Sequence, residues 1–158
     1  WESVTPDVMA SAKALGAGFP IGACLATEKA AVGMVAGTHG STFGGNMLTT
    51  AASYAGTKFL IDNNIPSKVK EMEPYLLGVL NDLKGRFSFI TEVRGKGLLA
   101  AMDFDSDISG QVLTAANEAG ILLNGPRPHT IRFMPPLNIT KEEIDEGVER
   151  LGRALATI

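Results

Sequence analysis

The apolar positions in the first part of the chain occur in short runs that glycine and proline interrupt. Residues 8–12 form one such run, bounded by Asp7 and by the glycine-rich segment 14–23. Its length and flanking residues predict a short strand that ends at Lys13. Residues 21–27 have the length of a second strand. The pattern therefore places a lysine at the edge between a strand and a loop.

A polar loop and a helix follow these strands. The segment THGSTFGG at 38–45 has no apolar periodicity and predicts a loop. Asn46 can cap a helix that runs from Met47 to about Ile61 through residues rich in Ala and Leu. The NNIP sequence directly after it is expected to end this helix.

A second region begins near Pro66 and opens with an amphipathic helix. Apolar residues recur there at spacings of three and four, at Val69, Met72, Leu76, Val79, Leu80 and Leu83. Ser67 is a possible cap for this helix. A proline inside a helix costs about 3 kcal/mol, so we expect Pro74 either to kink the helix or to lie near a start close to Glu73.

Paired strands come next. Two apolar runs, 87–93 and 97–104, are separated by RGKG and predict two strands that pair with each other. A helix over 108–119 then follows, and Gly120 is expected to stop it.

The last part of the chain predicts two more strands and a terminal helix. The strands are expected at 121–123 and 130–133, on either side of a loop rich in Gly and Pro. The final helix opens with a capping box from Thr140 to Glu143 and carries an apolar face. Taken together, the elements predict an α/β or α+β fold.

The composition favours a globular protein and argues against nucleic-acid binding and membrane spans. The 158 residues are 45% hydrophobic and 20% charged, as expected for a soluble globular protein with one sizeable core. The net charge of −3, without a basic stripe, argues against nucleic-acid binding. The longest uncharged stretches contain Gly, Pro, Ser, Thr and Asn, so no membrane span is expected. Cys24 is the one cysteine, which excludes an internal disulfide and fits a reducing cytoplasm; we expect it to be buried. No secretory leader is visible after Trp1.

Lys13 is the first candidate for chemistry. An ordinary lysine is a solvated surface charge, but Lys13 follows an apolar strand and is surrounded by small residues. These neighbours would let a planar cofactor approach the backbone closely. Burial would also favour the neutral amine, which is the form that attacks a carbonyl carbon. Lys13 therefore suits imine chemistry.

The same glycines allow one other interpretation. The segment GAGFPIG resembles the dinucleotide-binding pattern G-x-G-x-x-G, but its third glycine comes one residue late. Pro20 also lies where the phosphate-binding helix would continue. A nicotinamide-dependent enzyme is therefore a distant alternative.

Five sequence blocks resemble one enzyme family. They are DVMASAKALGAG at 7–18, GFPIGACLA at 18–26, HGSTFGGN at 39–46, VRGKGLLAAMDF at 93–104 and IRFMPPLNIT at 131–140. Their order and content are similar to the later part of class III pyridoxal-phosphate-dependent aminotransferases. The resemblance implies the carboxy-terminal portion of an aspartate aminotransferase-like fold. Residues 1–64 would end the large, cofactor-binding domain, and 65–158 would form the small α+β domain.

The resemblance also implies roles for individual residues. Lys13 would form the Schiff base with pyridoxal 5'-phosphate. Thr42 would bind the cofactor phosphate of the neighbouring subunit of a homodimer, and Ser41 would lie at the substrate. Arg132 would hold the substrate α-carboxylate by two parallel hydrogen bonds, its alternative being an arginine that extends to water.

Other residues have simpler expected roles. The bland alternative for the HGSTFGGN segment is an ordinary Gly/Ser turn. Met47 follows it where the family commonly has proline. Arg94, in VRGKG, is expected to have a structural role in a turn. His39 and His129 have no metal-ligand spacing, so no metal site is expected.

Within the class, the chain most resembles the acetylornithine aminotransferases. That family transfers an amino group from N-acetylornithine to 2-oxoglutarate in arginine biosynthesis. An ornithine or other omega-amino-acid aminotransferase is the alternative enzyme. The alternative from another class is a folded fragment or dimerisation domain without activity, because family members supply the phosphate loop, the ring-stacking aromatic and the pyridine-binding aspartate from sequence before these blocks.

Overall fold

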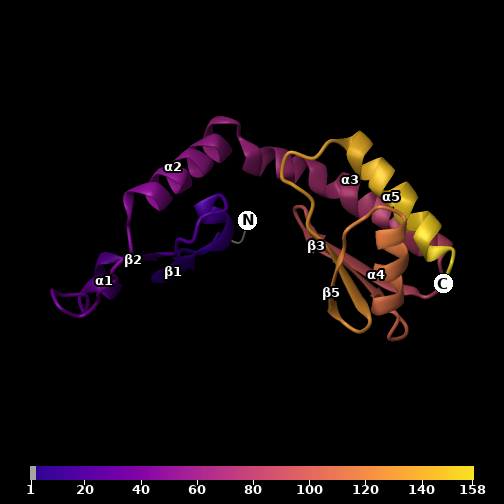
Figure 1. Cartoon of the computed structure of the whole chain (residues 1–158), viewed down its shortest axis with the longest axis horizontal. Helices are drawn as coiled ribbons and strands as arrows, with labels where there is room; N and C mark the ends of the chain where they lie inside the picture. The colour runs from indigo at the N-terminus through magenta and orange to yellow at the C-terminus, as the bar shows by residue number, and fades with distance from the viewer. Residues whose placement is uncertain (1–2) are drawn as a thin grey trace. The chain divides into compact units, whose positions relative to one another are not determined.

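The protein forms two compact units, and each is described separately. The computed structural model describes residues 3–158 and divides at 63/64. Figure 1 traces the chain through both units. In the described part, no helix has both the length and the apolar character that crossing a membrane requires.

The first unit is built around a small antiparallel pair of strands. Strand β1 (Val8–Ser11) pairs with β2 (Ala23–Ala26), with Val8 opposite Ala26 and Ser11 opposite Ala23. A short 3-10 helix, η1 (Lys13–Gly16), leads out of β1, and a single-turn helix α1 (Glu28–Ala31) follows β2. The two strands expected from the apolar runs are confirmed, whereas α1 was not expected.

Helix α2 (Met47–Asp62) starts where the sequence predicted it. The Asn46 side chain accepts a hydrogen bond from the backbone N–H of Thr49 at 3.1 Å, which satisfies one of the free amides of the first turn. Gly56 lets this helix approach the turn after η1, because a Cβ at Gly56 would lie 2.9 Å from the Cβ of Ala17. The helix and the turn are thereby held close together.

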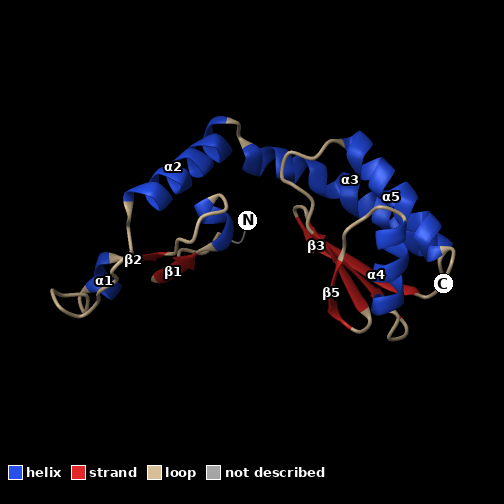
Figure 2. Cartoon of the chain, viewed as in Figure 1, coloured by secondary structure: helices blue, strands red, loops and turns tan. Residues whose placement is uncertain are grey.

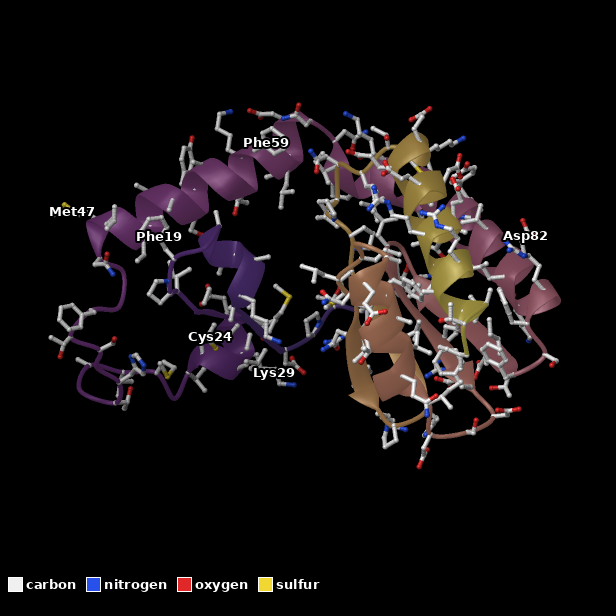
Figure 3. The ribbon with its side chains drawn as sticks, turned by 45° about the vertical axis from the view of Figure 1, so that its right-hand side comes forward. Phe19, Cys24, Lys29, Met47, Phe59 and Asp82 are labelled. Atoms are coloured by element: carbon white, nitrogen blue, oxygen red, sulfur yellow. The ribbon has the colours of Figure 1, made fainter. Side chains whose placement is uncertain are left out.

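The first unit has almost no buried interior. Among its described residues only Gly16 and Thr49 are buried. Helix α2 carries exposed apolar side chains at a seven-residue spacing, Met47 at 89%, Tyr54 at 69% and Ile61 at 71% exposure. Met47 points outward from the first turn of α2 (Figure 3). A helix that is apolar around its circumference is normally covered by protein, so this unit lacks the surface that covers it.

The second unit is a sheet covered by helices (Figure 2). Helix α3 (Ile65–Arg86) precedes β3 (Ile90–Lys96) and β4 (Leu99–Phe104). Helix α4 (Ser109–Glu118), β5 (Asn124–Arg127), β6 (Thr130–Phe133) and α5 (Lys141–Leu155) complete it. The antiparallel sheet has the strand order β3-β4-β6-β5.

The sheet buries one face and leaves the other open. Met102 and Ile131 are opposite each other on β4 and β6, and both are 0% exposed. They pack with apolar residues of the helices, among them Leu80, Leu83, Val112, Leu151 and Leu155. Because side chains alternate along a strand, Ala101, Asp103 and Arg132 project from the opposite face. The charged side chains of β4 and β6 therefore share the open face.

Helix α3 corrects two expectations. It is one continuous helix that begins at Ile65, so the alternative start near Glu73 is wrong. Its N-cap is Asn64, in a left-handed conformation with φ 50°, so Ser67 is not the cap. Pro74 lies inside the helix without ending it. Burial of the apolar face on both sides of Pro74 supplies the stabilisation that the missing hydrogen bond takes away.

The turn expected over RGKG is confined to the last residue of that segment and the one after it, Gly97 and Leu98. Strand β3 continues through Lys96, with Arg94 opposite Ala101 and Gly95 opposite Ala100. The reversal occurs at Gly97, whose φ is 59°. A Cβ at Gly95 would lie 2.8 Å from the carbonyl oxygen of Leu99, so this glycine permits close pairing of the strands. Arg94 is therefore a sheet residue, not a turn residue.

The strand expected at 121–123 is also displaced. Strand β5 instead covers Asn124–Arg127, with an irregular register between those two residues. It is an edge strand, where Pro126 is tolerated because its missing N–H faces no partner strand. Residues 121–123 follow the end of α4 without forming a strand: Gly120 has φ 80°, and the Ile121 N–H donates to the carbonyl of Ala116 at 2.8 Å, which closes the helix.

The terminal helix is confirmed in detail. The Thr140 hydroxyl accepts from the backbone N–H of Glu143 at 3.2 Å, and the Glu143 carboxylate accepts from the N–H of Thr140 at 2.8 Å. This is the reciprocal capping box that the sequence predicted.

The contrast between the units predicts different folding behaviour. Residues 64–158 expressed alone should unfold in one cooperative transition, because every buried hydrophobic residue in the described chain lies in this unit. Residues 1–63 alone should show no such transition. Chemical denaturation followed by circular dichroism measures both.

A pair of leucines provides the control within residues 64–158. Leu80→Ala removes a fully buried side chain and should lower the free energy of unfolding by about 2–5 kcal/mol. Leu122→Ala changes a side chain that is 88% exposed and should shift it by less than about 0.5 kcal/mol. Equal effects would contradict the assignment of the core.

Candidate active site

Lys13 occupies an unusual backbone position at the end of β1. Its φ is 53°, in the left-handed region that residues with a side chain seldom adopt. Such a conformation costs about 1–3 kcal/mol and persists only where the surroundings impose it. Here the Leu15 N–H donates to the carbonyl of Ala12, and the Ala17 N–H donates to that of Ala14, both at 3.1 Å. The lysine is thus fixed by the tight turn that follows it.

The Lys13 side chain is exposed within this chain. The expected burial of the lysine is therefore not produced by residues 3–158. Exposure leaves the amine accessible, and the small residues on both sides leave room for a flat ligand next to the backbone.

The hydroxyl-rich loop before α2 has a defined internal geometry. The Ser41 Oγ accepts a hydrogen bond from the Gly44 N–H at 2.9 Å, and the Asn46 side-chain amide donates to the carbonyl of Phe43 at 2.9 Å. A Cβ at Gly44 would lie 2.7 Å from the Ser41 Oγ, so this tight turn requires glycine. Thr42 is exposed, and nothing in the described chain hydrogen-bonds its hydroxyl.

A groove of the first unit runs between this loop and the segment after η1. It is lined by Pro20, Ile21, Gly22, His39, Ser41, Phe43, Gly44, Gly45, Asn46 and Thr49. The groove ends at the N-terminus of α2, where free backbone amides and the helix dipole favour an anion. Ser41 therefore lines a groove of suitable chemistry, whereas Lys13 and Thr42 are not among its lining residues.

Arg132 lies on the open face of the second unit's sheet. It is half-buried, and its Nε is fully buried without a hydrogen-bond partner. Among residues 3–158 no carboxylate is within ion-pair distance of its guanidinium. A buried donor without a partner costs about 1–3 kcal/mol, so the residue is prepared for a ligand with acceptor oxygens.

The groove in front of Arg132 contains two further arginines. Arg94, Ala101, Arg127, Thr130 and Arg132 are among its lining residues. Arg94 pairs with Asp103 through both guanidinium nitrogens, with 3.2 Å between Nη2 and Oδ1, and it also contacts Glu92 at 3.1 Å. The hydrogen bonds that Arg94 donates to Asp103 raise the pKa of Arg94 above its usual value. Arg94 is thus paired with carboxylates, whereas Arg132 in the same groove pairs with none among residues 3–158.

Asp103 was not found by sequence reasoning. Its hydrogen-bond partners are Arg94 and the Thr130 hydroxyl, which donates to Oδ1 at 2.7 Å. Burial raises its pKa, but these hydrogen bonds and the nearby positive charge outweigh burial and hold the pKa below the usual value. Extending the first of the two expected strands up to Lys96 would have placed Arg94 and Asp103 on one face of the sheet. Interpreting RGKG as a turn instead removed Arg94 from its strand.

Other candidate residues are less informative. Cys24, expected to be buried, is exposed on β2 (Figure 3), because the two-stranded sheet has no second layer over it. His129 lies 3.8 Å from the Asp107 carboxylate, which is a loop contact at the surface. Within the described residues, no group of three or more His, Cys, Asp or Glu side chains could hold a metal ion.

Comparison with known proteins identifies close similarity over the whole chain. The family model described as aminotransferase class-III matches residues 1–155. The acetylornithine aminotransferase of Methanothermobacter thermautotrophicus is 41% identical over 155 residues, which are 98% of this chain and 40% of that protein. The corresponding enzyme of Vibrio cholerae is 40% identical over 158 residues, 98% of this chain and 39% of that protein.

Solved structures agree with this similarity. The crystal structure of acetylornithine aminotransferase from Elizabethkingia anophelis matches with a TM-score of 0.92 at 31% identity, covering 99% of this chain and 40% of that one. Ornithine aminotransferase from Toxoplasma gondii matches with a TM-score of 0.91 at 33% identity, covering 99% and 38%. The expected fold is confirmed. The chain spans about two fifths of the length of these relatives.

The loop geometry gives a test that needs no knowledge of a ligand. Gly44→Ala in the full-length protein should break the hydrogen bond between the Ser41 Oγ and the backbone amide at 44. Loss of about 1 kcal/mol should speed hydrogen exchange of that amide about fivefold, after correction for the intrinsic rate. Gly40→Ala is the matched control, since no atom lies within 4 Å of a Cβ there. Similar exchange in both variants would disprove this account of the turn.

Proposed function

The chain belongs to the class-III aminotransferase family, and on this premise we propose that it is the carboxy-terminal portion of a pyridoxal-phosphate-dependent transaminase. Residues 1–64 end its large, cofactor-binding domain, and residues 65–158 form its small domain. The observation that carries the proposal is Lys13: an accessible amine, fixed in a left-handed turn among small residues, at the end of a strand.

The residues present fit the cofactor. Pyridoxal phosphate needs an amine for its aldehyde and hydrogen-bond donors for its phosphate, and it supplies an electron sink for the bonds around the substrate Cα when it is bound. Lys13 offers the amine. The Thr42 hydroxyl has no partner in the described chain, and the glycine-rich loop offers backbone amides. These groups bind a phosphate ester without requiring a large positive charge.

Lys13 has two tasks in this proposal. Its Nζ would hold the cofactor covalently, and the same amine, when released, would accept and return a proton at the substrate carbon that carries the amino group. A lysine fixed by the turn after β1 keeps the same position for both tasks. Thr42 binds the phosphate in the neighbouring subunit of a homodimer, and Ser41 lies at the substrate.

Arg132 recognises the part that both substrates share. The amino donor and the 2-oxo acid each carry an α-carboxylate. In the 2-oxo acid it adjoins the reacting carbon, whereas in N-acetylornithine the reacting amine lies at the other end of the side chain. A guanidinium binds such a carboxylate with two parallel hydrogen bonds, which fixes its orientation as well as its position. The buried Nε without a partner supports this role, because a carboxylate oxygen would satisfy it.

The substrates we propose are N-acetylornithine and 2-oxoglutarate, in arginine biosynthesis in the cytoplasm. Relatives at about 40% identity that bear the name acetylornithine aminotransferase support this choice. Ornithine or another omega-amino acid is the second candidate, favoured by the structural likeness to ornithine aminotransferases. Activity is proposed for the intact enzyme, because the chain covers about two fifths of its relatives and its first unit has almost no interior of its own.

The role of Lys13 is tested by chemical trapping in the intact enzyme. Borohydride reduction should leave the cofactor on the peptide that contains Lys13, as read by mass spectrometry. Lys13→Ala should lower kcat at least about 100-fold, because the proton-transfer group is lost. Lys29→Ala, which changes an exposed lysine in the same unit, should keep activity within about twofold. A reproducible adduct on another lysine would reject the assignment.

The role of Arg132 is tested by a conservative change. Arg132→Lys should raise KM for the 2-oxo acid about 10-fold or more, because an ammonium cannot form the bidentate pair, while cofactor affinity stays the same. Arg127→Lys is the matched control, because Arg127 lines the same groove from the edge strand. The substrate KM of this variant should change less than about threefold. Unchanged substrate affinity in Arg132→Lys would remove Arg132 from the site.

A further inference from the structure

Two arginines face each other across the open side of the sheet. Arg94 on β3 and Arg132 on β6 are both register partners of Ala101 on β4, the strand between them. Neighbouring strands are about 4.8 Å apart, so the two Cα atoms are separated by roughly 10 Å. Ala101 contributes only a methyl group to the space between them. Both guanidinium groups therefore line one groove.

One carboxylate is within reach of both arginines. Asp103 is two residues from Ala101 on the same strand and projects from the same face. Its register partners are Glu92 on β3 and Thr130 on β6, so Arg94 and Arg132 are its two diagonal neighbours. Diagonal neighbours in a sheet lie about 7–8 Å apart at Cα, a distance that long side chains span. The sheet register alone allows Asp103 to pair with either one.

The structure shows which pair forms. Both Asp103 oxygens are occupied: Oδ2 pairs with Nη1 of Arg94, and Oδ1 accepts from Nη2 of Arg94 at 3.2 Å and from the Thr130 hydroxyl at 2.7 Å. The Asp103 side chain is 17% exposed, so little water competes for it. Arg132, the other diagonal neighbour, is left without a carboxylate among residues 3–158, and its buried Nε has no partner.

We propose that Arg94 is a positioning residue that keeps Arg132 available to substrate by occupying Asp103. The inference rests on the proposed role of Arg132 in binding the substrate carboxylate. Without Arg94, the Asp103 carboxylate would have lost its main partner in a poorly hydrated position, and Arg132 would be the arginine at its remaining diagonal position on the same face. The resulting internal ion pair would compete with the substrate carboxylate for the same guanidinium.

A purely structural role for Arg94 leads to different behaviour. If Arg94 only joined β3 to β4, its loss would lower the free energy of unfolding without raising KM at unchanged kcat, and removing Asp103 as well would restore stability alone. If Arg94 prevents a competing pair, removing Asp103 abolishes the competitor and restores the site. The two roles are therefore separated by the double variant.

The experiment measures steady-state kinetics of the intact enzyme with both substrates. Arg94→Met should raise KM for the 2-oxo acid about 10-fold or more, the loss expected when a charge-assisted hydrogen bond must be displaced. The kcat at saturation should stay within about twofold, because saturating substrate displaces Asp103. Asp103→Asn should not raise KM. The double variant should return KM to within about threefold of the parent enzyme.

Further variants make the test independent of stability. Arg94→Lys keeps a cation beside Asp103 and should behave nearly as the parent, whereas Arg94→Gln keeps a donor without charge and should give an intermediate KM. If Arg94→Met fails to fold, the KM values of Arg94→Lys and Arg94→Gln still test the proposal. Glu92→Gln is the matched control. It removes the other carboxylate that pairs with Arg94, and because Glu92 is not a diagonal neighbour of Arg132, KM should stay unchanged.

The outcomes distinguish this inference from the proposed function. If Arg132→Lys leaves substrate KM unchanged, the proposed role of Arg132 fails. If Arg132→Lys raises KM and Arg94→Met does not, only the inference about Arg94 is overturned. It is also overturned if Arg94→Met raises KM and the double variant shows no recovery. Recovery in the double variant, with no effect of Glu92→Gln, supports it.

Discussion

The four-stranded sheet of the second unit is covered by helices on one of its faces, and the arrangement of the candidate substrate site depends on this constraint. The apolar side chains of β4 and β6, Met102 and Ile131 among them, are buried against α3, α4 and α5. Burying one such side chain is worth about 1.5–3 kcal/mol. A slip of one residue in the pairing would turn these side chains to solvent and bury Asp103 and Arg132 instead. The same burial that stabilises the unit therefore fixes which face the arginines occupy.

Charges on the open face are then sorted by short-range contacts. Asp103 has an arginine at a diagonal position on each neighbouring strand. Both of its carboxylate oxygens are occupied by Arg94 and the Thr130 hydroxyl. The pKa of Asp103 is lowered, so this carboxylate is ionised throughout the neutral range. An unpaired cation next to a satisfied ion pair is a simple way to present positive charge to a carboxylate ligand.

The first unit follows a different logic. Its reactive groups lie on a short strand pair and a glycine-rich loop whose local geometry is set by hydrogen bonds of only three residues' separation. Its helix α2 exposes apolar side chains along its length, and among residues 3–63 only Gly16 and Thr49 are buried. Precise positioning of Lys13 in an active enzyme would therefore rely on packing from outside this stretch, which is consistent with relatives about two and a half times as long.

The sequence by itself determined the features that depend on neighbouring residues. The Asn46 cap, the Thr140–Glu143 capping box and the helix stop at Gly120 were predicted correctly, because each is decided within a few positions along the chain. The family blocks predicted the fold and named Lys13, Ser41, Thr42 and Arg132 as candidates, roles that remain proposals. Tertiary structure decided the rest. The edge position of β5 made Pro126 acceptable in a strand, and burial of α3 made Pro74 acceptable in a helix. The continuation of β3 turned Arg94 from a turn residue into the partner of Asp103, since that pair joins residues nine positions apart through strand register, which local sequence does not specify.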